Sequence, residues 1–425
     1  MQDRSYIPFT EQMKDEYTIL IPTMLPMHFR LIASILHTYG YKLEVLDNSG
    51  PEVAEAGLGF VHNDACYPAV LVIGQFLRAL QEPGRDPHKL ALMLFQTGGG
   101  CRASNYVSLL RKALQRAGYD YVPVIGFSLG SLEKHPGFDL STRQLRSLLH
   151  AVIYGDLLMT LVNQTKPYEI RPGEAEALAA SWTERLGREL GIGGAIHWRR
   201  TKSNCRRIVA DFARIEKEQR PTVKVGVVGE IFVKYSPLGN NDLEQFLVDE
   251  GAEVVIPGLL DFCLYSVSDR LVDYQLYGKG RFSHLGYAAA FRELCRRKRE
   301  IIGLMREEGS FAPPTPFEEV FQLSEGYIGH GTKMGEGWLL TAEMLELVRS
   351  GVSNIVCTQP FGCLPNHIVG KGMIRRLKED YPDSNIVAID YDPGATKINQ
   401  ENRIKLMLAN AQKRRQMAEK QAAAV

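Results

Sequence analysis

The chain has 425 residues, of which 45% are hydrophobic and 23% are charged, and its formal net charge is +1. This composition is typical of a soluble globular protein, and the length predicts two or three domains. The balanced charge argues against a nucleic-acid surface, and the longest apolar runs fall short of the ~20 residues that span a bilayer. The charged amino terminus does not have the pattern of a signal peptide. We therefore expect a cytoplasmic protein with no nucleic-acid or membrane partner.

Strand-like and helix-like stretches alternate in the first part of the chain. Apolar runs predict strands at 17–22, 41–46, 89–96 and 121–127. Helical patterns between them are typical of a doubly wound parallel sheet. We predict a first α/β domain at residues 1–165 with cysteine-bearing loops, followed by a helical connector at 166–220.

The same alternation returns after the connector. Apolar runs predict strands at 223–228, 252–256, 355–356 and 385–390. We predict a second α/β domain at 221–410 and a fraying helical tail at 411–425. The expected fold class is thus α/β, with two doubly wound Rossmann-like (flavodoxin-like) domains and a helical connector.

Seven cysteines occur without any CxxC pair, which argues against a zinc ribbon or a ferredoxin-type run. We expect Cys66, Cys101 and the pair Cys357/Cys363 in loops at the ends of strands, where open α/β sheets bind ligands. Asn63, Asp64 and Pro68 also predict a helix that begins near Cys66. The other three cysteines, Cys205, Cys263 and Cys295, are expected to have packing or incidental roles.

Three glycines precede Cys101, between a predicted strand and a predicted helix. Backbone N–H groups in such a loop can converge on a phosphate or a cluster, and nearby side chains add donors. We therefore predict cofactor-binding roles for Gly99, Gly100, Arg102 and Asn105. The loop lacks both the GxGxxG spacing and the Lys-Ser/Thr of a P-loop, which argues against a nucleotide site. The alternative is a tight turn with a structural cysteine.

Two further residues are candidates for catalysis. Glu230 follows a predicted strand, where a carboxylate suits catalysis or ligand binding, and the alternative is a helix cap or an inter-domain contact. His367 follows Cys363 closely, and it is either a base or a loop hydrogen-bonding residue. Thiolates from separate loops favour a metal cluster, with zinc or a thiol nucleophile as the alternatives.

Six blocks resemble one protein family over nearly the whole chain. They are VHNDACYPAVLVIGQ, QTGGGCRASNY, GVVGEIFVKYSPLGNN, GEGWLLTAEM, QPFGCLPNHIVGKG and VAIDYDPGATKINQENRIKL. Together they resemble the large proteins related to 2-hydroxyacyl-CoA dehydratases and their activases. The resemblance implies two flavodoxin-like domains around an oxygen-sensitive iron–sulfur cluster, either 4Fe-4S or a double cubane. It implies Cys66, Cys101 and Cys363 as metal ligands, with Cys357 as the fourth.

The resemblance also implies a function. An ATP-hydrolysing activase would deliver a low-potential electron, and because no Walker motif or actin-like phosphate loop precedes Tyr17, we expect the activase to be a separate protein. The implied reaction is anaerobic radical dehydration of an acyl-CoA substrate, which would make the chain an iron–sulfur lyase. The alternatives are an ATP-dependent double-cubane-like reductase and a non-catalytic electron carrier or scaffold for the activase. A homo- or hetero-dimer fits each of these alternatives.

Overall fold

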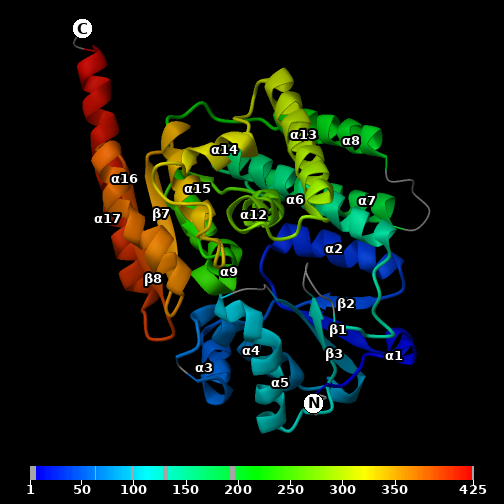
Figure 1. Cartoon of the computed structure of the whole chain (residues 1–425). Coiled ribbons are helices and arrows are strands. Elements are labelled where there is room, and N and C mark those ends of the chain that lie inside the picture. Colours follow the sequence, from blue (N-terminus) through cyan, green and yellow to red (C-terminus); the bar gives the residue numbers. More distant parts are fainter. Residues whose placement is uncertain (1–5, 63, 97–99, 128–132, 192–196, 424–425) are drawn as a thin grey trace.

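Two four-stranded parallel sheets organise the chain (Figure 1). The computed structural model describes residues 6–423, apart from 63, 97–99, 128–132 and 192–196. The strand orders are β2-β1-β3-β4 in the first sheet and β6-β5-β7-β8 in the second. The predicted fold class is therefore confirmed: the chain is an α/β protein with two doubly wound Rossmann-like units separated by helices.

A strand is present at each predicted position. The strands are β1 (Thr18–Ile21), β2 (Lys42–Val45), β3 (Leu90–Phe95), β4 (Val124–Phe127), β5 (Val223–Gly229), β6 (Ala252–Val255), β7 (Asn354–Pro360) and β8 (Asn385–Tyr391). The bounds of β7 correct one expectation, because Cys357 lies inside this strand and not in the loop behind it. Pairing with Val228 on one side and Ala388 on the other extends β7 beyond its apolar residues.

The chain order reverses at the centre of each sheet, between β1 and β3 and between β5 and β7. Ligands of open α/β sheets bind in the crevice that forms outside the carboxyl ends of such strands. Cys101 lies in the loop after β3, Glu230 follows β5, and Cys363 follows β7. Both sheets therefore place candidate residues at their switch points.

Helix α4 joins the two sheets into one core. The helices of the first domain are α1 (Glu11–Glu16), α2 (Pro26–Thr38), α3 (Pro51–Phe60), α4 (Tyr67–Leu80) and α5 (Tyr106–Ala117). Every residue of α4 except Arg78 is buried, and its apolar cluster includes Leu92 of the first sheet and Val225 and Val356 of the second. Such an all-round apolar helix belongs in an interior, so the two domains share hydrophobic packing.

Helix α3 was not predicted, because Gly57 and Gly59 lower its helix propensity. The structure explains why position 57 requires glycine. A Cβ added at Gly57 would lie 2.1 Å from the Val70 oxygen, and one at Gly74 of α4 would lie 1.9 Å from the Val53 oxygen. The two helices thus approach so closely that only glycine fits at the crossing, which positions the segment that leads into α4.

Three helices lie between the two sheets in the chain, α6 (Thr142–Thr165), α7 (Glu174–Leu190) and α8 (Trp198–Ala213), and the last two fall in the predicted connector at 166–220. By length and composition α6 is apolar enough to cross a membrane, although Arg143, Arg146 and Asp156 interrupt its apolar residues. However, 67% of its most apolar window is buried inside the molecule, where it contacts α2, α7 and α8. Core helices commonly have this composition.

The second domain contains most of the remaining helices. They are α9 (Ile231–Tyr235), α10 (Pro237–Asn240), α11 (Leu243–Asp249), α12 (Leu259–Tyr277), α13 (His284–Glu308), α14 (Phe317–Leu323), α15 (Trp338–Arg349), α16 (Ile374–Asp380) and α17 (Lys397–Ala423). Helix α12 was not predicted, and it places Cys263 among partly buried apolar side chains. Short helical turns also occur at Arg102–Asn105 and Asn366–Gly370, next to two of the candidate cysteines.

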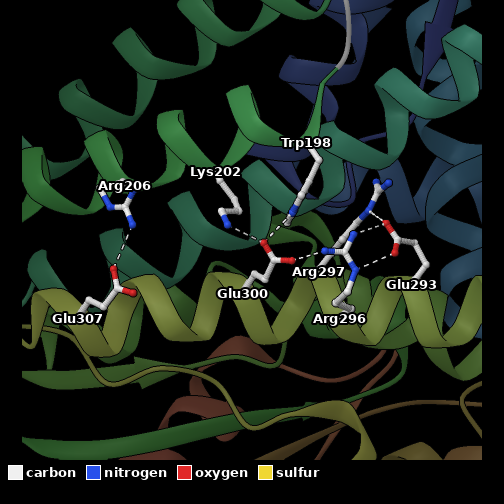
Figure 2. Close-up of polar contacts among 8 residues, drawn as sticks. All are labelled: Trp198, Lys202, Arg206, Glu293, Arg296, Arg297, Glu300 and Glu307. Carbon is white, nitrogen blue, oxygen red and sulfur yellow. Dashed lines mark hydrogen bonds and ion pairs between the residues drawn. The ribbon is translucent and has the colours of Figure 1, made fainter.

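Polar contacts tie the connector to the second domain along α8 and α13 (Figure 2). Glu300 accepts hydrogen bonds from Trp198 and Lys202 at 2.9 Å each, and Arg206 pairs with Glu307 at 3.1 Å. The full set is Trp198, Lys202, Arg206, Glu293, Arg296, Arg297, Glu300 and Glu307. Because exposed ion pairs contribute ~0–1 kcal/mol each, this set mainly fixes how the two helices lie against each other.

Candidate functional site

Cys66 lies at the entrance of α4, where it is the N-cap residue and Pro68 occupies the first turn. The predicted helix entrance is confirmed, but Cys66 follows helix α3 and does not lie at the end of a strand. Its side chain is buried, and its Sγ lies 2.9 Å from the Tyr106 hydroxyl. The Ala69 amide donates to the Cys66 carbonyl at 3.0 Å, and at this helix amino terminus it also lowers the pKa of the thiol.

Cys101 lies in the loop after β3 and begins the turn Arg102–Asn105. The cysteine is only partly buried, and the Ala103 amide lowers the pKa of its thiol. In the same loop the Gly100 amide donates to the Met334 sulfur at 3.0 Å. Gly99, which was predicted to bind a cofactor, lies outside the described residues.

Cys363 lies directly beyond β7, in a loop that packs against the amino end of α4. The Tyr67 amide donates to the Phe361 carbonyl at 3.0 Å, which joins the first domain to this loop. Gly362 has φ +75°, and a Cβ there would lie 3.2 Å from the Cys66 Cα. Glycine is therefore required both by the conformation and by the contact. This close approach brings the loop of Cys363 against Cys66.

The three cysteines Cys66, Cys101 and Cys363 act on one another electrostatically. Burial, together with the charges of Glu336 and Cys66, raises the pKa of the Cys101 thiol to about 11. Burial likewise raises the pKa of Cys363, with contributions from Glu336, Glu230 and Cys101. The pKa of Cys66 is also raised by burial, which outweighs the hydrogen bond from Tyr106. We call these three residues the thiol group.

A fourth loop closes on the thiol group from the second domain. It precedes α15 and contains Gly335 and Gly337, which both have positive φ. A Cβ at Gly335 would lie 3.4 Å from Pro365 and 3.8 Å from the Cys101 sulfur. Between the two glycines is Glu336, which is 6% exposed. The sequence analysis had not identified this carboxylate as a candidate.

Two carboxyl groups, Glu230 and Glu336, lie beside the thiol group. Glu230 caps α9 by accepting from the Val233 amide at 2.9 Å, and Glu336 accepts from the Ile231 amide at 2.8 Å. Burial and the neighbouring Glu336 raise the pKa of Glu230 to about 8. Burial also raises the pKa of Glu336. At neutral pH the pair therefore retains a proton. Glu230 follows a strand, as predicted from the sequence. It also caps a helix, which was the alternative role considered for it.

A buried cation lies behind these carboxyl groups. Lys234 Nζ pairs with Glu343 Oε1 at 2.9 Å, and both side chains are less than 5% exposed. Lys234 also lowers the pKa of Glu230 and Glu336 and so opposes the effect of burial. Buried ion pairs of this kind are kept in place by mutual charge compensation, so Lys234 anchors α9 beneath the crevice.

Other predicted residues lie at the edge of the site or outside it. Arg102 is exposed, binds the Asp64 carbonyl and lowers the pKa of Cys66, while Asn105 is exposed at the amino end of α5. Exposed His367 contacts the Gln359 side chain, with 3.0 Å between Gln359 Nε2 and His367 Nε2. This contact is of the kind expected if His367 is a hydrogen-bonding residue.

Cys357 lies in β7 and is fully buried among apolar side chains, and its sulfur lies 3.7 Å from the Asn366 side chain. The structure does not bring Cys357 to the thiol group.

The remaining cysteines lie elsewhere. Cys205 and Cys295 are buried in the cluster formed around α6, α8 and α13, and Cys263 packs against the same cluster. Burial raises the pKa of Cys205 and raises that of Cys295 to about 11, so both remain neutral thiols. Their positions agree with the packing roles expected from the sequence.

The three thiols are the donor type that iron–sulfur clusters take. In the described part of the chain, no three His, Cys, Asp or Glu side chains form a group that could hold one metal ion. Thiolates around one zinc ion lie within about 4.6 Å of each other, twice the ~2.3 Å Zn–S distance. A cluster is larger and is held by thiolates at separate corners. Three soft donors from three loops match that requirement.

The charges around the thiol group also fit a cationic group. Three thiols and the carboxyl groups of Glu230 and Glu336 all have raised pKa values. The cations that act on these groups within the described residues include Arg102 and Lys234. Because metal ligands must lose their protons, iron would supply the positive charge that the ionised thiols need.

A separate surface groove lies away from the thiol group. Its volume is about 640 Å³, and Lys371, Arg375, Lys378 and Arg403 are among its lining residues. The groove runs along β8, where Arg403 donates to the Ala388 carbonyl and pairs with Asp390. No cysteine lines this groove, so the thiol group remains the candidate site.

Comparisons with known proteins give no family assignment. No protein-family model matches the chain, and no curated protein matches it.

Proposed function

We propose that this chain is an iron–sulfur protein of the 2-hydroxyacyl-CoA dehydratase type. The observation that carries the proposal is the convergence of Cys66, Cys101 and Cys363 from three loops of two domains. When bound, the cluster supplies one-electron transfer, with an iron that acts as a Lewis acid. An ATP-hydrolysing partner provides the electron, and the substrate is a 2-hydroxyacyl-CoA whose hydroxyl group is eliminated.

The residues of the chain prepare the site for this chemistry. Three thiolates hold the cluster and leave at least one iron of a four-iron cluster without a cysteine ligand. Buried α4 and the close contact at Gly362 exclude water from one side of the thiol group. Glu230 and Glu336 retain a proton between their carboxyl groups, and this proton is available to a departing hydroxyl group.

Exposed apolar side chains around the crevice support a partner or an acyl substrate. Phe361, Leu364 and Ile368 are 54–67% exposed on the loop of Cys363, and Met334, which contacts Gly100, is 50% exposed. Large exposed apolar side chains that gather at one place commonly mark a binding surface. Their position next to the thiol group suits a protein that delivers an electron or a substrate that approaches the cluster.

The test is anaerobic reconstitution with iron and sulfide, followed by iron analysis and absorption spectroscopy. We expect Cys66→Ala, Cys101→Ala and Cys363→Ala each to abolish the brown chromophore. The matched controls Cys205→Ala and Cys295→Ala remove buried thiols elsewhere and retain it. Full iron content in any of the first three variants would remove that residue from the site, and in all three it would overturn the proposal.

A second experiment separates the reactions. The reconstituted protein is combined with an ATP-dependent activase of this type, ATP and a 2-hydroxyacyl-CoA, and the product is analysed for the unsaturated acyl-CoA. Product formation that requires both ATP and the cluster supports a dehydratase. Electron uptake without any product would support the alternative of a cluster-bearing electron carrier.

A further inference from the structure

The thiol group is asymmetric in its hydrogen bonds. One backbone amide from its own turn lowers the pKa of each cysteine: Ala69 for Cys66, Ala103 for Cys101 and Asn366 for Cys363. Cys66 has in addition a side-chain partner, the Tyr106 hydroxyl at 2.9 Å. Within the described residues, neither of the other two sulfurs has a side-chain hydrogen bond in this structure.

Tyr106 is held rigidly in this position. It is the first residue of α5, it follows the turn after Cys101 directly, and it is 8% exposed. Its ring packs in the core that contains α4 and the central strands of both sheets. The hydroxyl therefore reaches Cys66 from the segment that directly follows Cys101, which links two of the three candidate ligands.

The direction of this hydrogen bond follows from the chemistry of the two groups. A thiolate that binds iron has no proton, so it can only accept a hydrogen bond, and a neutral phenol donates one. The site is buried, so the donor acts in a medium of low dielectric, where hydrogen bonds are stronger. Hydrogen bonds to cluster sulfurs are among the factors that set the reduction potential.

We infer that Tyr106 is a positioning residue that raises the reduction potential of the cluster by donating a hydrogen bond to the Cys66 thiolate. This inference rests on the proposed function. Reduction adds one electron and therefore one negative charge, which spreads onto the thiolate sulfurs. A donor at Cys66 stabilises the reduced form more than the oxidised form. Tyr106 thus eases electron uptake at the side of the site that faces α4.

The experiment is an EPR-monitored redox titration of the anaerobically reconstituted full chain, with dithionite as the one-electron reductant. Tyr106→Phe removes the hydroxyl and retains the buried ring. We expect iron and sulfide contents equal to those of the wild type and an oxidised-to-reduced ratio about tenfold higher at a fixed potential. That change corresponds to a midpoint lowered by about 59 mV for one electron.

Two further variants test whether the change in midpoint potential is specific to the Tyr106 hydroxyl. Tyr41→Phe removes another buried hydroxyl, which donates to the Asp139 carbonyl at 3.2 Å, and we expect it to leave the midpoint unchanged. A ring-fluorinated tyrosine at position 106 keeps the shape and makes the hydroxyl a stronger donor. We expect this substitution to shift the midpoint in the opposite direction from Tyr106→Phe.

The failing outcomes are distinct. Wild-type protein that takes up no iron would overturn the proposed function and this inference together. Wild-type protein that forms the cluster, with an unchanged midpoint in Tyr106→Phe, would overturn the inference alone. Loss of iron from Tyr106→Phe would also overturn it, because the hydroxyl would then be required for assembly and would not simply tune the potential.

Discussion

The contact between Gly362 and Cys66 gives a quantitative test of how the two domains meet. Gly362 has φ +75°, and alanine in this left-handed conformation costs about 1–2 kcal/mol. The added Cβ would also lie 3.2 Å from the Cys66 Cα and 3.5 Å from the Ala65 oxygen. Overpacking against backbone typically costs a further ~1–3 kcal/mol. We expect Gly362→Ala to lower the free energy of unfolding by about 2–5 kcal/mol.

A matched control separates the two contributions. Gly84 has φ +88°, and nothing lies within 4 Å of a Cβ placed there. Gly84→Ala should therefore cost only the ~1–2 kcal/mol of backbone strain. Both variants and the wild type are compared by urea unfolding under reducing conditions. The Gly362 variant should also bind less iron after reconstitution, because Cys363 is displaced from Cys66. Equal unfolding free energies together with full iron binding in both variants would refute the close approach.

Three further changes test the surroundings of the thiol group. Because the pKa of Glu230 is raised to about 8, its carboxyl destabilises the folded protein as the pH rises from the unfolded-state value near 4.5 to 8. In urea unfolding, Glu230→Gln should therefore gain stability relative to wild type between about pH 5 and about pH 8, by up to about 1.4 kcal/mol per pH unit, and a flat difference would contradict the pKa shift. Lys234→Met leaves the Glu343 carboxylate buried without its partner and should cost about 3–5 kcal/mol, whereas adding Glu343→Leu should recover most of that loss of unfolding free energy. Cys357→Ala should retain the iron content of the wild type in reconstitution, and loss of iron would return Cys357 to the ligand set.

The strands could be predicted because apolar runs bounded by glycine, proline and polar residues are a local signal. The end of β7 was misjudged because Cys357, Thr358 and Gln359 are not aliphatic, yet strands on both sides supply hydrogen-bond partners through these residues. Helix α3 was missed because its glycines weaken the helical pattern, although they allow the close contact with α4. These errors share one cause, since tertiary packing outweighed local propensity.

For the site, sequence patterns could name the cysteines but not their neighbours. Cys66, Cys101 and Cys363 each stand out because glycine, proline or capping residues surround them. The roles of Tyr106 and Glu336 depend on which loops meet in space, and Glu336 is 270 positions from Cys66 in the chain. A carboxylate between two glycines in the segment GEGW was the available signal, and without the fold it had no partner.

The most direct measurement is the EPR spectrum and iron content of the wild-type chain after anaerobic reconstitution, before and after reduction. We expect about four irons per chain, as one 4Fe-4S cluster requires, and a signal that appears or changes on one-electron reduction. Protein that retains no iron, or that binds one zinc ion in its place, would contradict the assignment of Cys66, Cys101 and Cys363 as cluster ligands.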